Sequence, residues 1–261
     1  MEIHMSESKE VLTLEKFHEA LHKDIDKPVK NFRKEWNQAH HRYMKVHTGA
    51  HRALWAKAIV LLEQKVIIVH VNLNFKQNGI SDADYEKLKY LARIGIDKYW
   101  SRRINVAGTS FMVRVKAEHN YQNAIPVDLY VETDKNNYAR SMNPAILGID
   151  ASFIYNKGWH IDTENADSDF QLISAHEFGH SVLMYAGGLS LSWGHKGSTN
   201  PVTQSVKSSA PGYPKKGSID LMKYYNQGKS EANLFRRVTD SVAMETDVKR
   251  LIWGAQIKWS K

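Results

Sequence analysis

Residues 176–180 read His-Glu-Phe-Gly-His, a combination of residue types that can hold a metal ion beside a proton acceptor. On an α-helix, side chains four residues apart lie on one face, so the imidazoles of His176 and His180 can reach the same ion. The Glu177 side chain points off that line and is better placed to accept a proton from a water molecule than to bind the metal. The pattern therefore predicts a zinc centre with Glu177 as general base for hydrolysis.

The residues around this pattern have the features of a helix. Ser168 can cap the helix with Gln171 at the third helical position, which is the spacing of a capping box. Apolar residues recur at roughly helical intervals, among them Phe170, Ile173 and Val182. Gly187 and Gly188 supply a stop. We therefore predict a helix that carries the pattern and ends at these glycines.

Composition limits the kind of metal site that the chain can build. The 261 residues include 13 histidines and no cysteine. Without thiolates, a metal must be held by His, Asp, Glu or water, so cysteine-based zinc fingers, cysteine proteases and disulfide frameworks are excluded. A chain of this length can bury a sizeable core, and we expect one catalytic domain with an N-terminal helical addition.

The charge and hydropathy of the chain exclude further classes. The formal net charge is +8 at pH 7, but the basic residues are spread along the chain without a nucleic-acid-binding signature, so we expect no specific nucleic-acid partner. No apolar run approaches the roughly 18 residues of a membrane span, and no transmembrane segment is expected. Residues 1–10 do not have the apolar core of a signal peptide and are expected to be a tag-like or disordered N-terminus.

Two regions follow these residues. Residues 11–64 are predicted to be an N-terminal helical segment because apolar residues recur there at helical spacing, for example Leu54, Ala58 and Leu61 near its end. The region 65–261 is predicted to be the catalytic domain.

The catalytic domain is predicted to be α+β. Strand patterns cover residues 66–75, 110–118, 127–133 and 149–156, a helix capped at Ser81 extends to about Arg103, and a final helix runs from about Glu231 to Lys258. The fourth strand pattern alternates like an edge strand shortly before the motif helix. Such an edge would let an extended peptide add to the sheet beside the metal. We expect a twisted mixed sheet with a backing helix, followed by the motif helix and a C-terminal helix.

A catalytic zinc ion takes three protein ligands and keeps one position for water, so a third ligand must be found. In metzincins the motif continues with a Gly and a His, but Leu183 and Ala186 stand at those positions here. The candidates lie further along the chain: His195, Asp220, Glu231 and Glu245.

Some of these residues could act without binding the metal. His195 could stabilise the oxyanion of a tetrahedral intermediate or contact the substrate, and the phenol of Tyr224 or Tyr225 could do the same. Met222 follows Asp220 closely, in a segment that resembles the Met-turn that passes beneath the zinc of metzincins.

From about Ser168 onward the chain resembles a known family. The sequences HEFGHS, SWGHKGS and IDLMKYY, together with residues 247–253, are similar to the metallopeptidase effector domains attached to VgrG spike proteins of type VI secretion systems. The resemblance implies a zincin, metzincin-like fold and one zinc ion held by His176, His180 and a later acidic residue, which falls on Asp220. It also implies an antibacterial toxin that is exported with a spike without a signal peptide, acts in the periplasm of the target cell and is countered by an immunity protein.

These observations lead to one expected function with two alternatives. The expected function is that of a zinc-dependent metallopeptidase which hydrolyses a protein or peptide substrate, with the isolated domain as a monomer. One alternative is a secreted interaction module with a structural or vestigial zinc site, which would need a closed set of four ligands. The other is an intracellular housekeeping metalloprotease, which would have the same chemistry.

Overall fold

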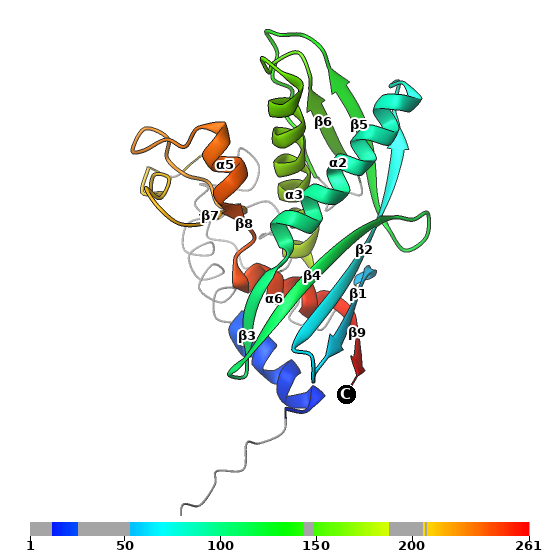
Figure 1. Ribbon diagram of the computed structural model, residues 1–261, viewed down its shortest axis with the longest axis vertical. Coiled ribbons are helices and arrows are strands. Elements are labelled where there is room, and N and C mark those ends of the chain that lie inside the picture. Colours follow the sequence, from blue (N-terminus) through cyan, green and yellow to red (C-terminus); the bar gives the residue numbers. More distant parts are fainter. Residues whose placement is uncertain (1–11, 26–52, 144–148, 188–205, 207, 261) are drawn as a thin grey trace, which may run out of the picture.

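The computed structural model describes residues 12–25, 53–143, 149–187, 206 and 208–260. Their main feature is a seven-stranded mixed sheet accompanied by helices, which confirms the predicted α+β class (Figure 1). Its strands are β1 (Ala53–Leu61), β2 (Val66–Gln77), β3 (Arg102–Val106), β4 (Thr109–His119), β5 (Ile125–Glu132), β6 (Ala151–Asn156) and β9 (Ala255–Ser260). A separate two-stranded sheet joins β7 (Ile219–Asp220) to β8 (Ser241–Val242).

The described helices are one over residues 14–25, α2 (Asp82–Trp100), α3 (Thr163–Gly187), α5 (Leu234–Asp240) and α6 (Glu245–Gly254). Helices α2, α3 and α6 pack on the large sheet, whereas α5 packs on α3 and β8. Among the described residues, none of these helices is both long and apolar enough to cross a membrane.

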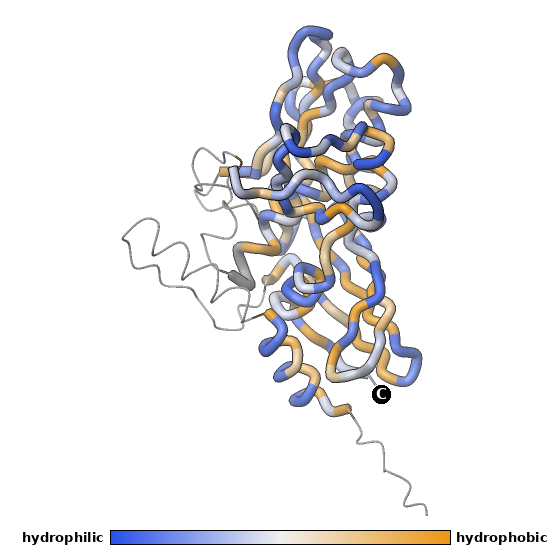
Figure 2. Tube along the Cα trace, turned by 90° about the vertical axis from the view of Figure 1, so that its left-hand side faces the viewer, coloured by the Kyte–Doolittle hydropathy of each residue, from blue (hydrophilic) through white to orange (hydrophobic). Residues whose placement is uncertain are grey.

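The long strand β2 organises the sheet. It pairs with β1 in an antiparallel hairpin and with β4 in parallel, while its end pairs with β5, which in turn pairs in parallel with β6. Along β2 every second side chain is buried, which is the pattern of a sheet with one covered face. Figure 2 shows hydrophobic residues along much of the chain inside the molecule and hydrophilic residues at many of the outer turns. The sheet and its helices thus form two layers around one core.

Helices α2 and α3 cross at very short distance. Gly95 of α2 lies against the backbone of α3, so that a Cβ atom at this position would be 2.3 Å from the carbonyl oxygen of Gln171. One turn further along α2, the indole nitrogen of Trp100 donates a hydrogen bond of 3.0 Å to the carbonyl oxygen of Ala175. Because Ala175 precedes the motif directly, this crossing fixes the motif helix in the core.

The N-terminal segment, residues 11–64, was predicted to be helical, and this prediction is wrong for its last part. Residues 53–61 form β1, which pairs with β2 on one side and with β9 on the other. The apolar residues in this segment fit either period, and the hydrogen bonds of two neighbouring strands decide for the strand. A boundary between residues 64 and 65 would therefore separate hydrogen-bonded neighbours of one sheet. Residues 26–52 of the predicted helical segment lie outside the described residues.

The single C-terminal helix predicted over Glu231–Lys258 is also wrong. The chain forms α5, β8, α6 and β9 in succession. Asn233 begins α5 by accepting a hydrogen bond from the backbone of Arg236, and Ser241 ends it in an extended conformation. The last segment leaves the helical path because it gains a strand partner, β1, with which it pairs in parallel.

Other sequence predictions hold with adjusted limits. Ser81 caps α2 by accepting a hydrogen bond of 3.1 Å from the Asp84 amide, as predicted. The helix ends at Trp100 and not near Arg103, because residues 102–106 form β3, an edge strand that the sequence pattern did not indicate. The strands predicted around residues 110–118, 127–133 and 149–156 are confirmed as β4, β5 and β6.

At Gly95, helix propensity and packing predict opposite effects of an alanine substitution on stability. By propensity alone, Gly95→Ala should stabilise α2 by about 1 kcal/mol. The added methyl group would instead meet the backbone of Gln171, so we expect the free energy of unfolding to fall by about 1–3 kcal/mol. Urea denaturation of both proteins measures the change. A variant more stable than the wild type would contradict the close crossing.

Candidate metal centre

The motif lies in the middle of a helix that begins earlier than predicted. Helix α3 starts at Thr163, and the carboxylate of Asp162 accepts a hydrogen bond of 2.7 Å from the Asn165 amide. Ser168 is inside the helix, so the predicted cap at Ser168 is wrong. The helix ends at Gly187, as the sequence predicts. The motif is therefore about three turns from the N-terminus, inside a fully formed helix.

The three chemically active side chains of the motif converge on one place. Ligand atoms of His176, Glu177 and His180 all lie within 4.8 Å of one another, and no other such group of His, Asp or Glu occurs in the described part of the chain. Glu177 is 7% exposed and His180 is 4% exposed, while His176 is part-buried. The two imidazoles lie on one face of the helix with ring centroids 5.2 Å apart, as the sequence predicts, and the Glu177 carboxylate lies close to them.

The protonation of His176 follows from its partner. Its Nδ1 atom lies 2.6 Å from the carbonyl oxygen of Leu221. A carbonyl oxygen can only accept a hydrogen bond, so Nδ1 must carry the proton. This leaves the lone pair of Nε2 free of a proton and fixes the orientation of the ring, which is how metal-binding histidines are commonly held.

The residue after Leu221 packs beneath the motif. Met222 is fully buried, and a Cβ atom at Gly179 would lie 2.2 Å from its Sδ atom and 2.8 Å from its Cε atom. The indole of Trp100 lies 2.9 Å from the same point. Position 179 therefore has room only for glycine. Met222 occupies a structural position below the helix, as the sequence analysis expected from its place in the chain.

Burial shifts the protonation equilibria of the motif. Desolvation raises the pKa of Glu177 to about 8, and only the positive charge of Arg140 opposes this shift. Desolvation also lowers the pKa of His176 to about 4, although the hydrogen bond to Leu221 opposes it. A bound cation would favour the charged carboxylate, and metal binding needs a neutral imidazole. The set of donor atoms therefore fits a divalent metal ion.

The candidate third ligands are placed differently. Asp220 is 9% exposed, its Oδ1 atom accepts a hydrogen bond of 3.0 Å from the Met222 amide, and it is not a member of the cluster of ligand atoms. Glu245 pairs with Lys249 at 2.7 Å and does not join the cluster either. Glu231 is exposed. His195 lies outside the described residues.

The two tyrosines after Met222 have distinct surroundings. The hydroxyl of Tyr224 accepts a hydrogen bond of 2.9 Å from the guanidinium of Arg140. Tyr225 stacks on Tyr213 with ring centroids 4.5 Å apart, and its hydroxyl accepts a hydrogen bond from the Asp220 amide. Tyr224 is therefore the better candidate for contact with a substrate, and Tyr225 supports the segment that contains Asp220.

Sequence reasoning missed the segment before the fourth predicted strand. Met142 and Ser152 exchange two backbone hydrogen bonds, so the outer edge of β6 is partly used by the chain itself and is not free for a peptide along its whole length. In this segment, Asn143 donates hydrogen bonds to the carbonyl oxygen of Glu177 at 2.7 Å and to the hydroxyl of Ser181 at 2.9 Å. These contacts depend on tertiary folding, and no periodicity in the sequence indicates them.

A cavity opens beside His176. Its volume is about 630 Å³, and it lies between α3, residues 219–228 and α5. Its lining includes His176, Asp220, Tyr224 and Arg237. Asp220, the candidate third ligand, and Tyr224, the candidate for oxyanion contact, thus line the same cavity as His176.

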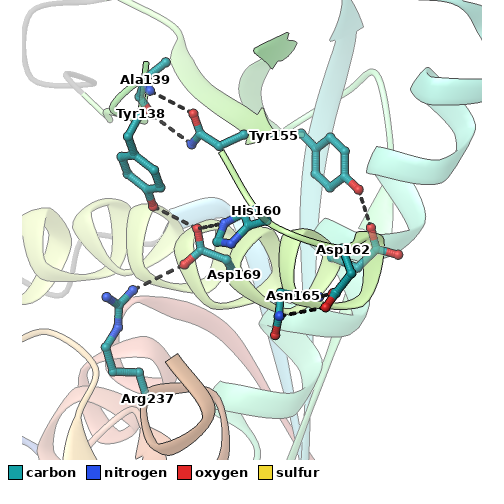
Figure 3. A network of polar contacts seen from close by, with 10 residues as sticks. Tyr138, Ala139, Tyr155, His160, Asp162, Asn165, Asp169 and Arg237 are labelled. Atoms are coloured by element: carbon teal, nitrogen blue, oxygen red, sulfur yellow. Dashed lines mark hydrogen bonds and ion pairs between the residues drawn. The ribbon is translucent and has the colours of Figure 1, made fainter. Parts of the chain in front are cut away.

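The buried carboxylate of Asp169 connects Arg237, which lines the cavity, to the segment that contains Tyr138 and His160. Asp169 of α3 is 3% exposed and accepts hydrogen bonds from the Tyr138 hydroxyl at 2.9 Å and from His160 at 3.1 Å (Figure 3). Its other oxygen pairs with the Arg237 guanidinium at 3.2 Å. Asp169 thus holds Tyr138, His160 and Arg237 in place.

Comparisons with known proteins identify no family for this chain. No family model, no curated protein and no solved structure matches it. Its function must therefore be inferred from the chemistry of the motif and its surroundings.

The contact between Gly179 and Met222 can be tested by a double-mutant cycle. We expect Gly179→Ala to lower the free energy of unfolding by about 2 kcal/mol, because the added methyl group overlaps Sδ of Met222. In the Met222→Ala background the same change should be less costly, with a coupling free energy of at least about 1 kcal/mol. Thermal and urea unfolding of the four proteins measure this coupling. Strictly additive effects would rule out direct contact.

Proposed function

We propose that this protein is a zinc-dependent metallopeptidase in which His176 and His180 bind the metal and Glu177 is the general base. The observation that carries the proposal is the convergence of the three ligand atoms within 4.8 Å on one buried helix. The hydrogen bond from His176 to Leu221 supports it, because this bond presents the unprotonated nitrogen of the ring. Arg140 and Tyr224 lie close enough to take part in binding a substrate.

The residues divide the chemistry between them. When bound, zinc polarises the scissile carbonyl group and lowers the pKa of a water molecule towards neutrality. Glu177 accepts the proton from the attacking water and delivers it to the leaving amine. Its buried position suits a carboxyl group that must both take and release a proton near neutral pH. Tyr224, held by Arg140, is the candidate to stabilise the developing oxyanion.

Asp220 remains our prediction for the third ligand. It lines the same cavity as His176 and precedes the Leu221 carbonyl and Met222, both of which contact the motif helix. Its neighbour Tyr225 and the pairing of β7 with β8 hold its backbone in place. A carboxylate that is anchored in this way beside the first motif histidine would supply the third protein ligand that a catalytic zinc ion takes.

A zincin, metzincin-like fold is part of this proposal. Three features support it: a mixed sheet, the helix α2 against the motif helix α3, and a methionine packed beneath the motif. The resemblance of residues 168–261 to effector domains of VgrG spike proteins suggests the biological setting. We propose export through a type VI secretion system, action in the periplasm of a target bacterium and an immunity protein as partner.

The role of Glu177 can be separated from metal binding. We expect Glu177→Gln to retain about one zinc ion per chain and to lose at least about 10³-fold in the rate of peptide cleavage, because the amide cannot accept the proton. His176→Ala and His180→Ala should lose both zinc and activity. Elemental analysis and cleavage of denatured protein substrates measure these properties. Glu164→Gln, an exposed change on the same helix, is the matched control.

The same proteins test the biological setting. Wild type and Glu177→Gln are produced in the cytoplasm of a test bacterium and, with an added signal peptide, in its periplasm. We expect growth to stop only with the periplasmic wild type. Toxicity that survives Glu177→Gln, with zinc still bound, would favour an interaction module with a structural metal over a peptidase.

The third ligand is identified by comparing four variants. We expect Asp220→Ala to lose most of its zinc, whereas His195→Ala, Glu231→Ala and Glu245→Ala retain it, because Glu245 is held by Lys249 and Glu231 is exposed. Zinc affinity is measured by competition with a coloured chelator, and circular dichroism checks folding. Retention of full affinity in Asp220→Ala, with loss in one of the others, would move the ligand to that residue.

A further inference from the structure

We propose that Arg237 binds a carboxylate group of the substrate in the cavity beside His176, so that the enzyme acts on peptides with a negative charge close to the scissile bond. The proposal rests on the metallopeptidase function, since it takes this cavity as the place where the substrate lies. The geometry that carries it is an arginine which is held by a buried acid on one side and faces the cavity on the other.

The cavity adjoins the reactive groups directly. It is bounded by the side of α3 that carries Ile173 and His176, by the segment around Asp220 and Tyr224, and by Arg237 of α5. Its volume of about 630 Å³ is sufficient for one or two amino-acid side chains of a bound peptide. A group bound here would lie next to a scissile bond placed at His176.

Arg237 is held in a fixed position. One of its nitrogen atoms pairs with Oδ1 of Asp169 at 3.2 Å, and the Asp169 side chain is only 4% exposed. The other oxygen of Asp169 accepts hydrogen bonds from Tyr138 and His160, so the carboxylate cannot turn away (Figure 3). This arrangement removes much of the entropy that an arginine side chain loses when it binds a ligand.

The guanidinium group also has donors to offer. Arginine carries five N–H donors in a planar fork, and the structure assigns one of its nitrogens to Asp169. The side chain is 32% exposed and lines the cavity, so part of the fork can face a ligand. A planar fork of donors matches the two oxygens of a carboxylate.

The charges around the cavity favour an anion. Among the described residues that line it, Lys223 and Arg237 are cationic and Asp220 is the only carboxylate. One oxygen of Asp220 is already used by the Met222 amide. Arg140 adds a further positive charge beside Tyr224. The charged groups of the lining are thus two cations and one carboxylate, a balance that favours an anionic substrate group over a cationic one.

A peptide can present a carboxylate in two ways: as an acidic side chain or as a free C-terminus. The test therefore uses fluorogenic peptides in which Glu is exchanged for Gln at each of the three positions on either side of the scissile bond. Each peptide is prepared with a free C-terminal carboxylate and with a carboxamide. The zinc-loaded full chain is assayed with all of them.

We expect kcat/KM to be about 10- to 100-fold higher for a peptide with the carboxylate than for its neutral counterpart, which is the range for a hydrogen bond to a charged group. The peptide series identifies the source of the carboxylate. In Arg237→Gln this ratio should fall to near one, and in Arg237→Lys it should be reduced but not lost, because the charge remains without the fork.

Arg236→Gln is the matched control. Arg236 is the neighbour of Arg237 on α5 and also makes an ion pair of 3.2 Å, with Asp240, but it does not line the cavity. This variant should keep the full preference for the carboxylate. If Arg237→Gln does not fold, Arg237→Lys decides: an undiminished preference in that variant would overturn the proposal.

Two results separate this proposal from the peptidase function. Binding of the acidic and neutral peptides to Glu177→Gln is measured by calorimetry, which needs no turnover. If wild type cleaves no peptide but Glu177→Gln binds the acidic form more tightly through Arg237, the peptidase function fails and the carboxylate site stands. If peptides are cleaved without preference for a carboxylate in wild type, the carboxylate site is refuted and the peptidase function stands.

Discussion

The close crossing of α2 and α3 is the constraint on which the candidate metal centre depends. Gly95 lets the two backbones meet, and Trp100 adds a hydrogen bond to the carbonyl oxygen of Ala175. Since His176 is the next residue, any rotation of α3 would break this bond and carry both imidazoles together out of their present orientation, including the contact of His176 with the Leu221 carbonyl. The rigid crossing therefore holds the ligands in place, and it does so through residues that carry no reactive group.

A second attachment comes from a distant part of the chain. The small sheet of β7 and β8 brings residues 219–222 to α3, where the Leu221 carbonyl orients His176 and Met222 fills the space below Gly179. The motif helix is thus held from two sides by segments more than 40 residues away in either direction. Such agreement between separate contacts is what a site with fixed geometry requires.

The sequence predicted the motif helix, its end at Gly187 and the shared face of His176 and His180, because the helical period determines the relative positions of residues four apart. It also placed Met222 correctly. It could not predict β1 or β9, since apolar residues in short segments fit a helix or a strand equally well and the choice depends on strand partners. Arg140 and Asn143 were missed because their contacts depend on the tertiary fold: the segment that contains them lies beside the edge of β6, where no sequence period indicates its partners.

The burial of the motif favours a functional site over a vestigial one. Glu177 and His180 are almost fully buried, whereas the neighbouring polar groups of Ser181 and Asn143 are hydrogen-bonded to each other. Removing such groups from water costs free energy unless hydrogen bonds or charges compensate for it, and apolar residues of similar size would pack there without that cost. A cation that binds only the folded chain would compensate for it, and its binding would add to the stability of the fold. The polar cluster on α3 therefore has the donor atoms and the burial that the proposed metal site requires, and the Arg237–Asp169 ion pair adds a fixed pair of charges near it.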